Sequence, residues 1–69
     1  MSGSGSGEFA AADKQLQEAY YTLGLMYWEQ EKYPAVIRNM VQALNVDDSD
    51  ADAWYWLGEG QLKQKLPSD

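Results

Sequence analysis

The side chains best suited to chemistry are the carboxylates that gather after residue 46. Asp48, Asp50, Asp52 and Glu59 occupy the first, third, fifth and twelfth places of one stretch, the spacing of oxygen ligands in an EF-hand calcium loop. The sixth place holds Ala53, however, whereas the sharp turn of such a loop needs glycine. Calcium binding is therefore one hypothesis. Helix capping by the same acids in a solvated turn is the other.

Catalytic chemistry has little support in the sequence. The 69 residues include no histidine and no cysteine, and neither Ser49 nor Ser68 has a general base nearby in the chain. Carboxylates alone can perform acid–base work, but nothing in the sequence pairs two of them in an apolar pocket. We therefore expect a non-enzymatic protein that carries no cofactor and no resident metal.

The net charge of −6 restricts the classes of partner. It argues against nucleic acid, because phosphates require a basic surface, and against adhesion to anionic lipid. The longest apolar run is shorter than the ~20 residues of a membrane span, and the N-terminus lacks the basic and apolar regions of a secretory signal. A protein or peptide with apolar and basic residues is the partner that fits best.

The ends of the chain differ in composition from its middle. Residues 1–9 consist of a Gly/Ser-rich stretch followed by a Glu-Phe pair typical of a cloning junction, and we expect a flexible linker there. Residues 10–66 form the expected domain, and residues 67–69 a tail. Below about 70–80 residues a core rarely supplies more than about 3–5 kcal/mol, so stability must come from helix packing or from association.

Apolar periodicity predicts an all-α chain of three helices, at about residues 13–31, 34–46 and 51–65. Pro34 suits the start of the second helix, because its missing N–H costs nothing there. The second helix carries an apolar stripe. Asp13 and Asp50 are the expected N-caps, with a start one turn earlier, at Ala10 to Ala12, as the alternative for the first helix. Asp52 in the first turn and Lys63 and Lys65 in the last turn of the third helix complement its dipole.

An internal repeat relates the first and third predicted helices. Tyr20-Tyr21-Thr22-Leu23-Gly24 is echoed by Trp54-Tyr55-Trp56-Leu57-Gly58, and the two glycines lie 34 residues apart. On these residues, together with Tyr27, Tyr33, Ala43 and Leu44, the chain resembles the tetratricopeptide repeat family over roughly residues 17–64. The resemblance implies one antiparallel helix-turn-helix repeat plus the first helix of the next.

The resemblance also implies several local features. It makes residues 53–59 helical, so the calcium loop becomes the minor alternative. It places Gly24 opposite Val36 in the hairpin. Glu31 stands where the family usually has glycine, which implies a strained corner between the first two helices.

The outer face of the first and third helices is the expected binding surface. With Tyr20, Leu23 and Tyr27 directed to the hairpin core, the opposite side of both helices is rich in aromatic and aliphatic residues with an acidic rim. The family implies a concave groove for partner peptides at these positions. The predicted partner-binding residues are Glu18, Tyr21, Leu25, Trp28, Glu29, Asp52, Tyr55, Trp56, Glu59 and Leu62.

Two alternatives explain the same apolar surface without a bound peptide. One and a half repeats leave the third helix without a hairpin partner, and repeat units do not bury their faces alone. The chain therefore either associates with a second copy, with exchange of helices as one form of dimer, or represents a repeat scaffold without a ligand of its own.

Overall fold

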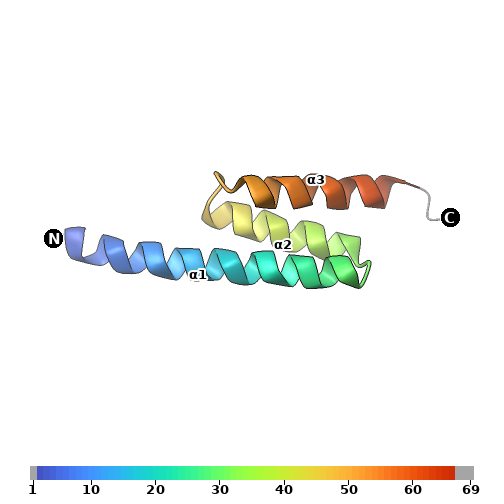
Figure 1. Ribbon diagram of the computed structural model, residues 1–69. Helices are drawn as coiled ribbons and strands as arrows, with labels where there is room; N and C mark the ends of the chain where they lie inside the picture. The colour runs from blue at the N-terminus through green and yellow to red at the C-terminus, as the bar shows by residue number, and fades with distance from the viewer. Residues whose placement is uncertain (1, 67–69) are drawn as a thin grey trace.

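The computed structural model describes the backbone of residues 2–66 and the side chains of residues 12–66. Three helices occupy this part of the chain, with no strand: α1 (Ser2–Glu29), α2 (Tyr33–Val46) and α3 (Ala51–Lys65). Successive helices run antiparallel, and α2 lies between the other two (Figure 1). The predicted all-α, helix-turn-helix architecture is confirmed, and the bounds of α3 are those predicted.

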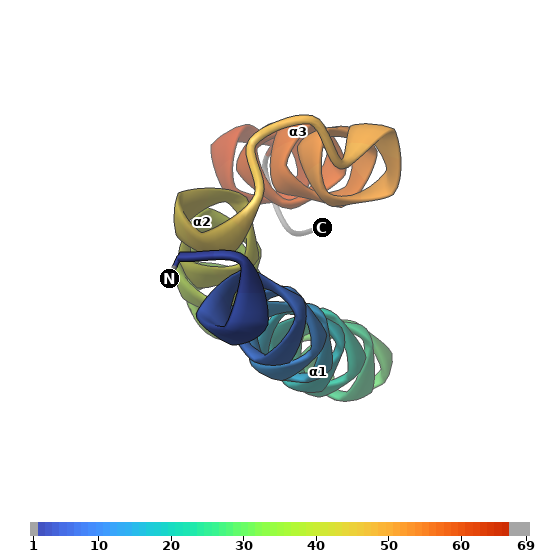
Figure 2. The same ribbon diagram turned by 90° about the vertical axis from the view of Figure 1, so that its left-hand side faces the viewer.

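The three helices form a wedge with α2 at its apex. Seen along the bundle, α1 and α3 contact different sides of α2 and both lean away from it toward the same side (Figure 2). Helix α1 is much longer than the others, and its N-terminal half projects beyond them (Figure 1). The wedge therefore has an open side, where α1 and α3 face each other.

The N-terminal boundary of α1 differs from the expected one. The helix begins at Ser2, so Asp13 lies inside α1 and is not an N-cap, and residues expected to form a flexible linker continue the helix. The physical reason is that extending an existing helix adds one hydrogen bond for each residue fixed, and no proline interrupts this segment. A prediction from composition alone therefore places the start of α1 too late in the chain.

The corner between α1 and α2 is built on a left-handed residue. Glu31 has φ of 61°. Its N–H donates to the carbonyl of Trp28 (3.0 Å), and the N–H of Lys32 donates to the carbonyl of Tyr27 (2.9 Å). These two bonds form a Schellman motif, which usually places glycine where Glu31 stands. The strained corner expected from the sequence is therefore present, although α1 ends at Glu29 and not at residue 31.

The corner between α2 and α3 is organised by side-chain hydrogen bonds from two aspartates. Asp47 Oδ1 accepts from the backbone N–H (3.0 Å) and the hydroxyl (2.6 Å) of Ser49. Asp50 Oδ1 accepts from the N–H groups of Asp52 (3.1 Å) and Ala53 (3.3 Å). Asp50 is thus the N-cap of α3, as predicted, and the turn fixes the direction in which α3 starts.

The core belongs mainly to α2. Val36, Met40 and Ala43 are fully buried, and Leu44 nearly so; Ala53 and Leu57 of α3 complete the buried cluster. Half-buried side chains from all three helices pack around it: Tyr20, Tyr21, Leu25, Tyr27, Trp28, Ile37 and Trp56. Because α2 has a neighbour on two sides, its apolar positions are covered more completely than those of α1.

Two glycines allow α1 and α3 to approach α2 closely. A Cβ added at Gly24 would lie 2.5 Å from the terminal methyl of Met40, and one added at Gly60 would lie 3.1 Å from Ile37 Cγ1. The predicted partner of Gly24, Val36, instead faces α3 and lies 3.5 Å from the same point at Gly60. The nearest neighbour of Gly24 is thus Met40 and not the predicted Val36, because α2 divides its apolar residues between two neighbours.

Leu23 also differs from its expected position. It was expected in the hairpin core, but 41% of its surface is exposed. Its repeat equivalent, Leu57, is buried because α3 contacts α2 with that side. Helix α1 turns its glycine side to α2 instead, and this leaves Leu23 at the margin of the contact.

We predict that Glu31→Gly stabilises the protein by about 1 kcal/mol. An L-residue in the left-handed region costs about 1–2 kcal/mol, and the greater freedom of glycine in the unfolded chain offsets part of the gain. The free energy of unfolding in urea measures the change. Glu31→Ala is the matched control, since it removes the carboxylate but keeps the strain; an equal gain in both variants contradicts the explanation.

Met40→Ala should leave the protein largely unfolded. Truncating a fully buried methionine costs about 2–5 kcal/mol, which is comparable with the total stability expected of a core this small. Far-ultraviolet circular dichroism during thermal melting tests this. Val41→Ala is the control on the next residue, which is 40% exposed, and it should melt close to the parent protein. A Met40→Ala variant that melts with it would refute the assignment of α2 as the core.

Candidate functional site

Aromatic side chains meet where α1 and α3 face each other on the open side of the wedge. We call Tyr21, Trp28, Tyr55 and Trp56 the aromatic cluster. The ring of Trp56 lies edge-on to those of Trp28 and Tyr55, with centroids 5.0 Å and 5.1 Å apart. The indole N–H of Trp56 donates to the hydroxyl of Tyr21 at 3.1 Å. The cluster therefore connects α1 to α3 independently of α2.

The packing of the cluster explains how each ring is held. Trp28 also contacts Tyr33 at the start of α2, with centroids 5.2 Å apart. Edge-on pairs of this kind contribute about 0.5–1.5 kcal/mol beyond area burial, and the hydrogen bond satisfies the indole of Trp56. Tyr55 is different, because 58% of its surface remains exposed. It is the member of the cluster most available to a partner.

The repeat pattern predicts that these side chains point away from the core, and this is only partly correct. Tyr21, Leu25, Trp28 and Trp56 are half-buried and pack against the buried cluster of α2 and α3. The cause is the wedge, in which α3 approaches α1 closely enough for side chains from both to fill the space. The predicted face is thus half-buried and is not a row of free side chains. We call the surface formed by the aromatic cluster the aromatic wall.

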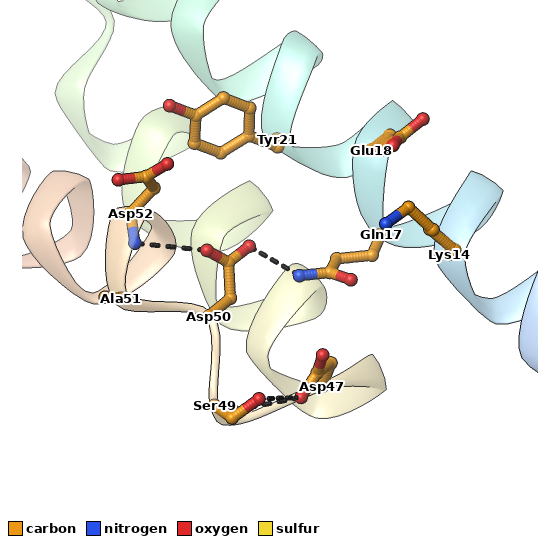
Figure 3. A pocket seen from close by; sticks show the side chains of 9 residues that line it. All are labelled: Lys14, Gln17, Glu18, Tyr21, Asp47, Ser49, Asp50, Ala51 and Asp52. Atoms are coloured by element: carbon orange, nitrogen blue, oxygen red, sulfur yellow. Dashed lines mark hydrogen bonds between the residues drawn. The ribbon is translucent and has the colours of Figure 1, made fainter.

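An acidic hollow adjoins the cluster near the start of α3 (Figure 3). It is open to solvent and has a volume of about 450 Å³. Carboxylates reach it from α1, from the turn and from α3, and Tyr21 forms the boundary with the aromatic cluster. The residues that line the hollow are Lys14, Gln17, Glu18, Tyr21, Asp47, Ser49, Asp50, Ala51 and Asp52.

Two hydrogen-bonded groups shape this hollow. The amide of Gln17 donates to Asp50 Oδ2, the oxygen opposite the one that caps α3 (Figure 3). The bond joins α1 to the second turn across 33 residues of sequence. Beside it, the hydroxyl and then the N–H of Ser49 lower the pKa of Asp47, and Lys14 adds a smaller contribution. Asp47 therefore remains a carboxylate to lower pH than usual.

The predicted partner-binding residues divide into three groups. Tyr21, Trp28, Tyr55 and Trp56 form the aromatic cluster, while Glu18 and Asp52 reach the hollow. The remaining four belong to neither set: Leu25 is half-buried against the core, Glu29 exposed at the end of α1, Glu59 half-buried on α3, and Leu62 exposed on α3.

Several residues of the hollow were not predicted. Asp50 was recognised as a cap, but a cap uses one carboxylate oxygen and leaves the other free for Gln17. No periodic signal in the sequence connects Gln17 or Lys14 to that turn. The one available signal was the density of acids between residues 47 and 52, which indicates negative charge but not its neighbours.

The calcium hypothesis does not match the geometry. Helix α3 covers Ala51 to Glu59, so this stretch does not form the loop that an EF-hand requires. Within the described part of the chain, no group of three acidic, histidine or cysteine side chains is arranged to hold a metal ion.

No helix between residues 2 and 66 is both long and apolar enough to cross a membrane.

No family model, curated protein or solved structure matches this chain. Interpretation of the site therefore depends on its own geometry and on the internal repeat. The arrangement offers a half-buried aromatic cluster between α1 and α3, beside a negatively charged hollow made by α1, the turn before α3 and the start of α3.

We predict that Ser49→Ala raises the pKa of Asp47 toward its ordinary value, because it removes the hydroxyl that lowers it most. When folding lowers the pKa of a carboxyl group, its ionised form stabilises the protein at pH values above the pKa in the unfolded chain. This stability is lost as the pH falls through the lower pKa of the folded protein. The variant should therefore lose less stability on acidification. Carboxyl NMR titration measures the pKa. Ser49→Thr, which keeps the hydroxyl, should behave like the parent protein, and an unchanged pKa in Ser49→Ala contradicts this account.

Proposed function

We propose that this chain comprises one and a half tetratricopeptide repeats and acts as a non-enzymatic protein–protein interaction module. The partner is a protein or peptide segment with apolar and basic residues. The surface is formed by the aromatic cluster and the acidic hollow. The observation that carries the proposal is the contact of Trp28 with Trp56, which leaves a half-buried aromatic wall with Tyr55 exposed beside it.

The repeat assignment is supported by the equivalence of α1 and α3. Gly24 is buried against α2, as a close-packed hairpin requires. Gly58, its equivalent 34 residues later, has no atom within 4 Å of an added Cβ. Helix α3 thus echoes residues 20–24 of α1 in its residues 54–58, but no helix lies on its Gly58 side. This is the expected state of the first helix of a second repeat.

The chemistry of the surface supports an amphipathic partner. Tyrosine and tryptophan are the residues that most often anchor interfaces, because they bury large area at low entropic cost. Four carboxylates surround the hollow and one lysine opposes them, so a basic side chain of the partner finds complementary charge next to the aromatic wall. Such rim charges affect the association rate and specificity more than the affinity.

Self-association is a second candidate, favoured by the exposed apolar side chains of the outer helices. On α1, Leu16, Leu23 and Met26 are each 41–52% exposed, and α3 has similar residues. A second copy, including one that exchanges helices, would cover such faces. A repeat scaffold without its own ligand remains the alternative if neither a peptide nor a second copy binds.

Binding of a synthetic amphipathic helical peptide of leucine and lysine tests the proposed site. We expect saturable changes in tryptophan fluorescence and in the amide NMR signals around Trp56, with affinity falling as salt rises. A matching peptide of leucine and glutamate should bind more weakly. Tyr55→Ala should weaken binding about tenfold, because it removes the exposed anchor without disturbing the core.

Charge reversal at the hollow gives the matched control. Glu18→Lys should weaken binding of the basic peptide about threefold to tenfold, mainly through slower association. Glu31→Lys makes the same charge change at the far corner and should have little effect. Equal loss in both variants indicates attraction by net charge alone and rules out the hollow as the specific site.

A further inference from the structure

One face of α3 carries a stripe of exposed apolar residues. Trp54, Gly58 and Leu62 of α3 and the C-cap residue Leu66 follow one another at four-residue spacing, and we call them the α3 stripe. The three large side chains are 50–53% exposed, and the space above Gly58 is empty within 4 Å of an added Cβ. Residues four apart lie on one ridge of a helix, which is the feature that packs against a neighbouring helix.

The α3 stripe lies on the side of α3 away from Trp56, and Tyr55, three residues before Gly58, borders it. Trp56 and Gly58 are two residues apart, so they lie on nearly opposite sides of α3. Trp54 is held in place on the stripe, because its indole N–H donates to the carbonyl of Asp48 at 2.8 Å. A large apolar ring that is fixed while exposed loses little entropy when it is covered.

The order of residues along the stripe is self-complementary. Gly58 lies midway between Trp54 and Leu62. When two copies of α3 pair antiparallel about a two-fold axis at Gly58, each Trp54 lies opposite Leu62 of the other copy, and the two glycines permit close approach. Gly24 shows the principle within this molecule, where its missing Cβ admits Met40.

Charge selects the antiparallel arrangement. The N-terminal end of α3 carries Asp48, Asp50 and Asp52, whereas its last turn carries Lys63 and Lys65. An antiparallel pair places the acids of each copy near the lysines of the other, and the helix dipoles also oppose each other favourably. A parallel pair would place like charges together at both ends.

We propose that the α3 stripe is a homodimer interface, in which a second copy of this chain packs its α3 antiparallel across Gly58. The proposal does not depend on the peptide site, which uses other residues of α1 and α3. It accounts for an exposed apolar face on a helix that has acidic residues at its N-terminal end and lysines in its last turn.

Sedimentation equilibrium over a range of concentrations, with Gly58→Gln as the test variant, examines the interface. The parent protein should show a reversible monomer–dimer equilibrium. Gly58→Gln should remain monomeric at concentrations where the parent dimerises, while melting no lower when dilute, because a Cβ added there has no atom of its own molecule within 4 Å and glutamine favours helix. Ala19→Gln, at an exposed position of α1, is the control and should dimerise normally.

Single cysteines test the orientation, since the chain has none of its own. In the antiparallel pair, the two copies of residue 51 are roughly 21 Å apart along the axis, so Ala51→Cys alone should not form a disulfide on mild oxidation. A mixture of Ala51→Cys and Lys65→Cys should form the mixed disulfide. The proposal is overturned if the parent protein stays monomeric or if Ala51→Cys alone cross-links efficiently. It is also overturned if Gly58→Gln dimerises as before, which is the result expected of a helix-exchanged dimer.

Discussion

The burial of α2 between two helices is the constraint on which the rest of the structure depends. With no cysteine to form a disulfide, the fold relies on Val36, Met40, Ala43 and Leu44, which point to two neighbours and are almost fully covered. Helices α1 and α3 each contribute one covering face. Their own positions are therefore set by how they fit α2, and the space left between them becomes the open side of the wedge.

This arrangement gives the aromatic cluster two roles at once. On the open side of the wedge, the core is covered by Tyr21, Trp28 and Trp56. The same side chains form the aromatic wall beside the hollow. Substituting Trp28 or Trp56 therefore alters stability together with any binding, whereas Tyr55 and Glu18 lie far enough out to separate the two effects. A ligand that covers the wall binds only the folded state, and so stabilises a chain whose own core is small.

The features of the fold that could be predicted from the sequence are those that local signals determine. The sequence located α2 and α3 closely, because apolar stripes, Pro34 and the Asp50 cap are all local signals. It did not predict that Gly24 meets Met40, because this depends on how α2 shares its residues between two neighbours. The hydrogen bond from Gln17 to Asp50 was equally invisible, since a contact across 33 residues leaves no periodic trace.

The internal repeat also explains why the two outer helices expose different faces. Leu23 is exposed whereas its equivalent Leu57 is buried, and Gly24 is buried whereas its equivalent Gly58 is open. A contact between these two unlike faces would be heterologous and, unless it closed into a ring, would continue into a filament. A contact of the Gly58 face with itself closes after two copies. The segregated charges of α3 favour the closed form, because only the antiparallel pair brings the acidic end of one copy to the lysines of the other.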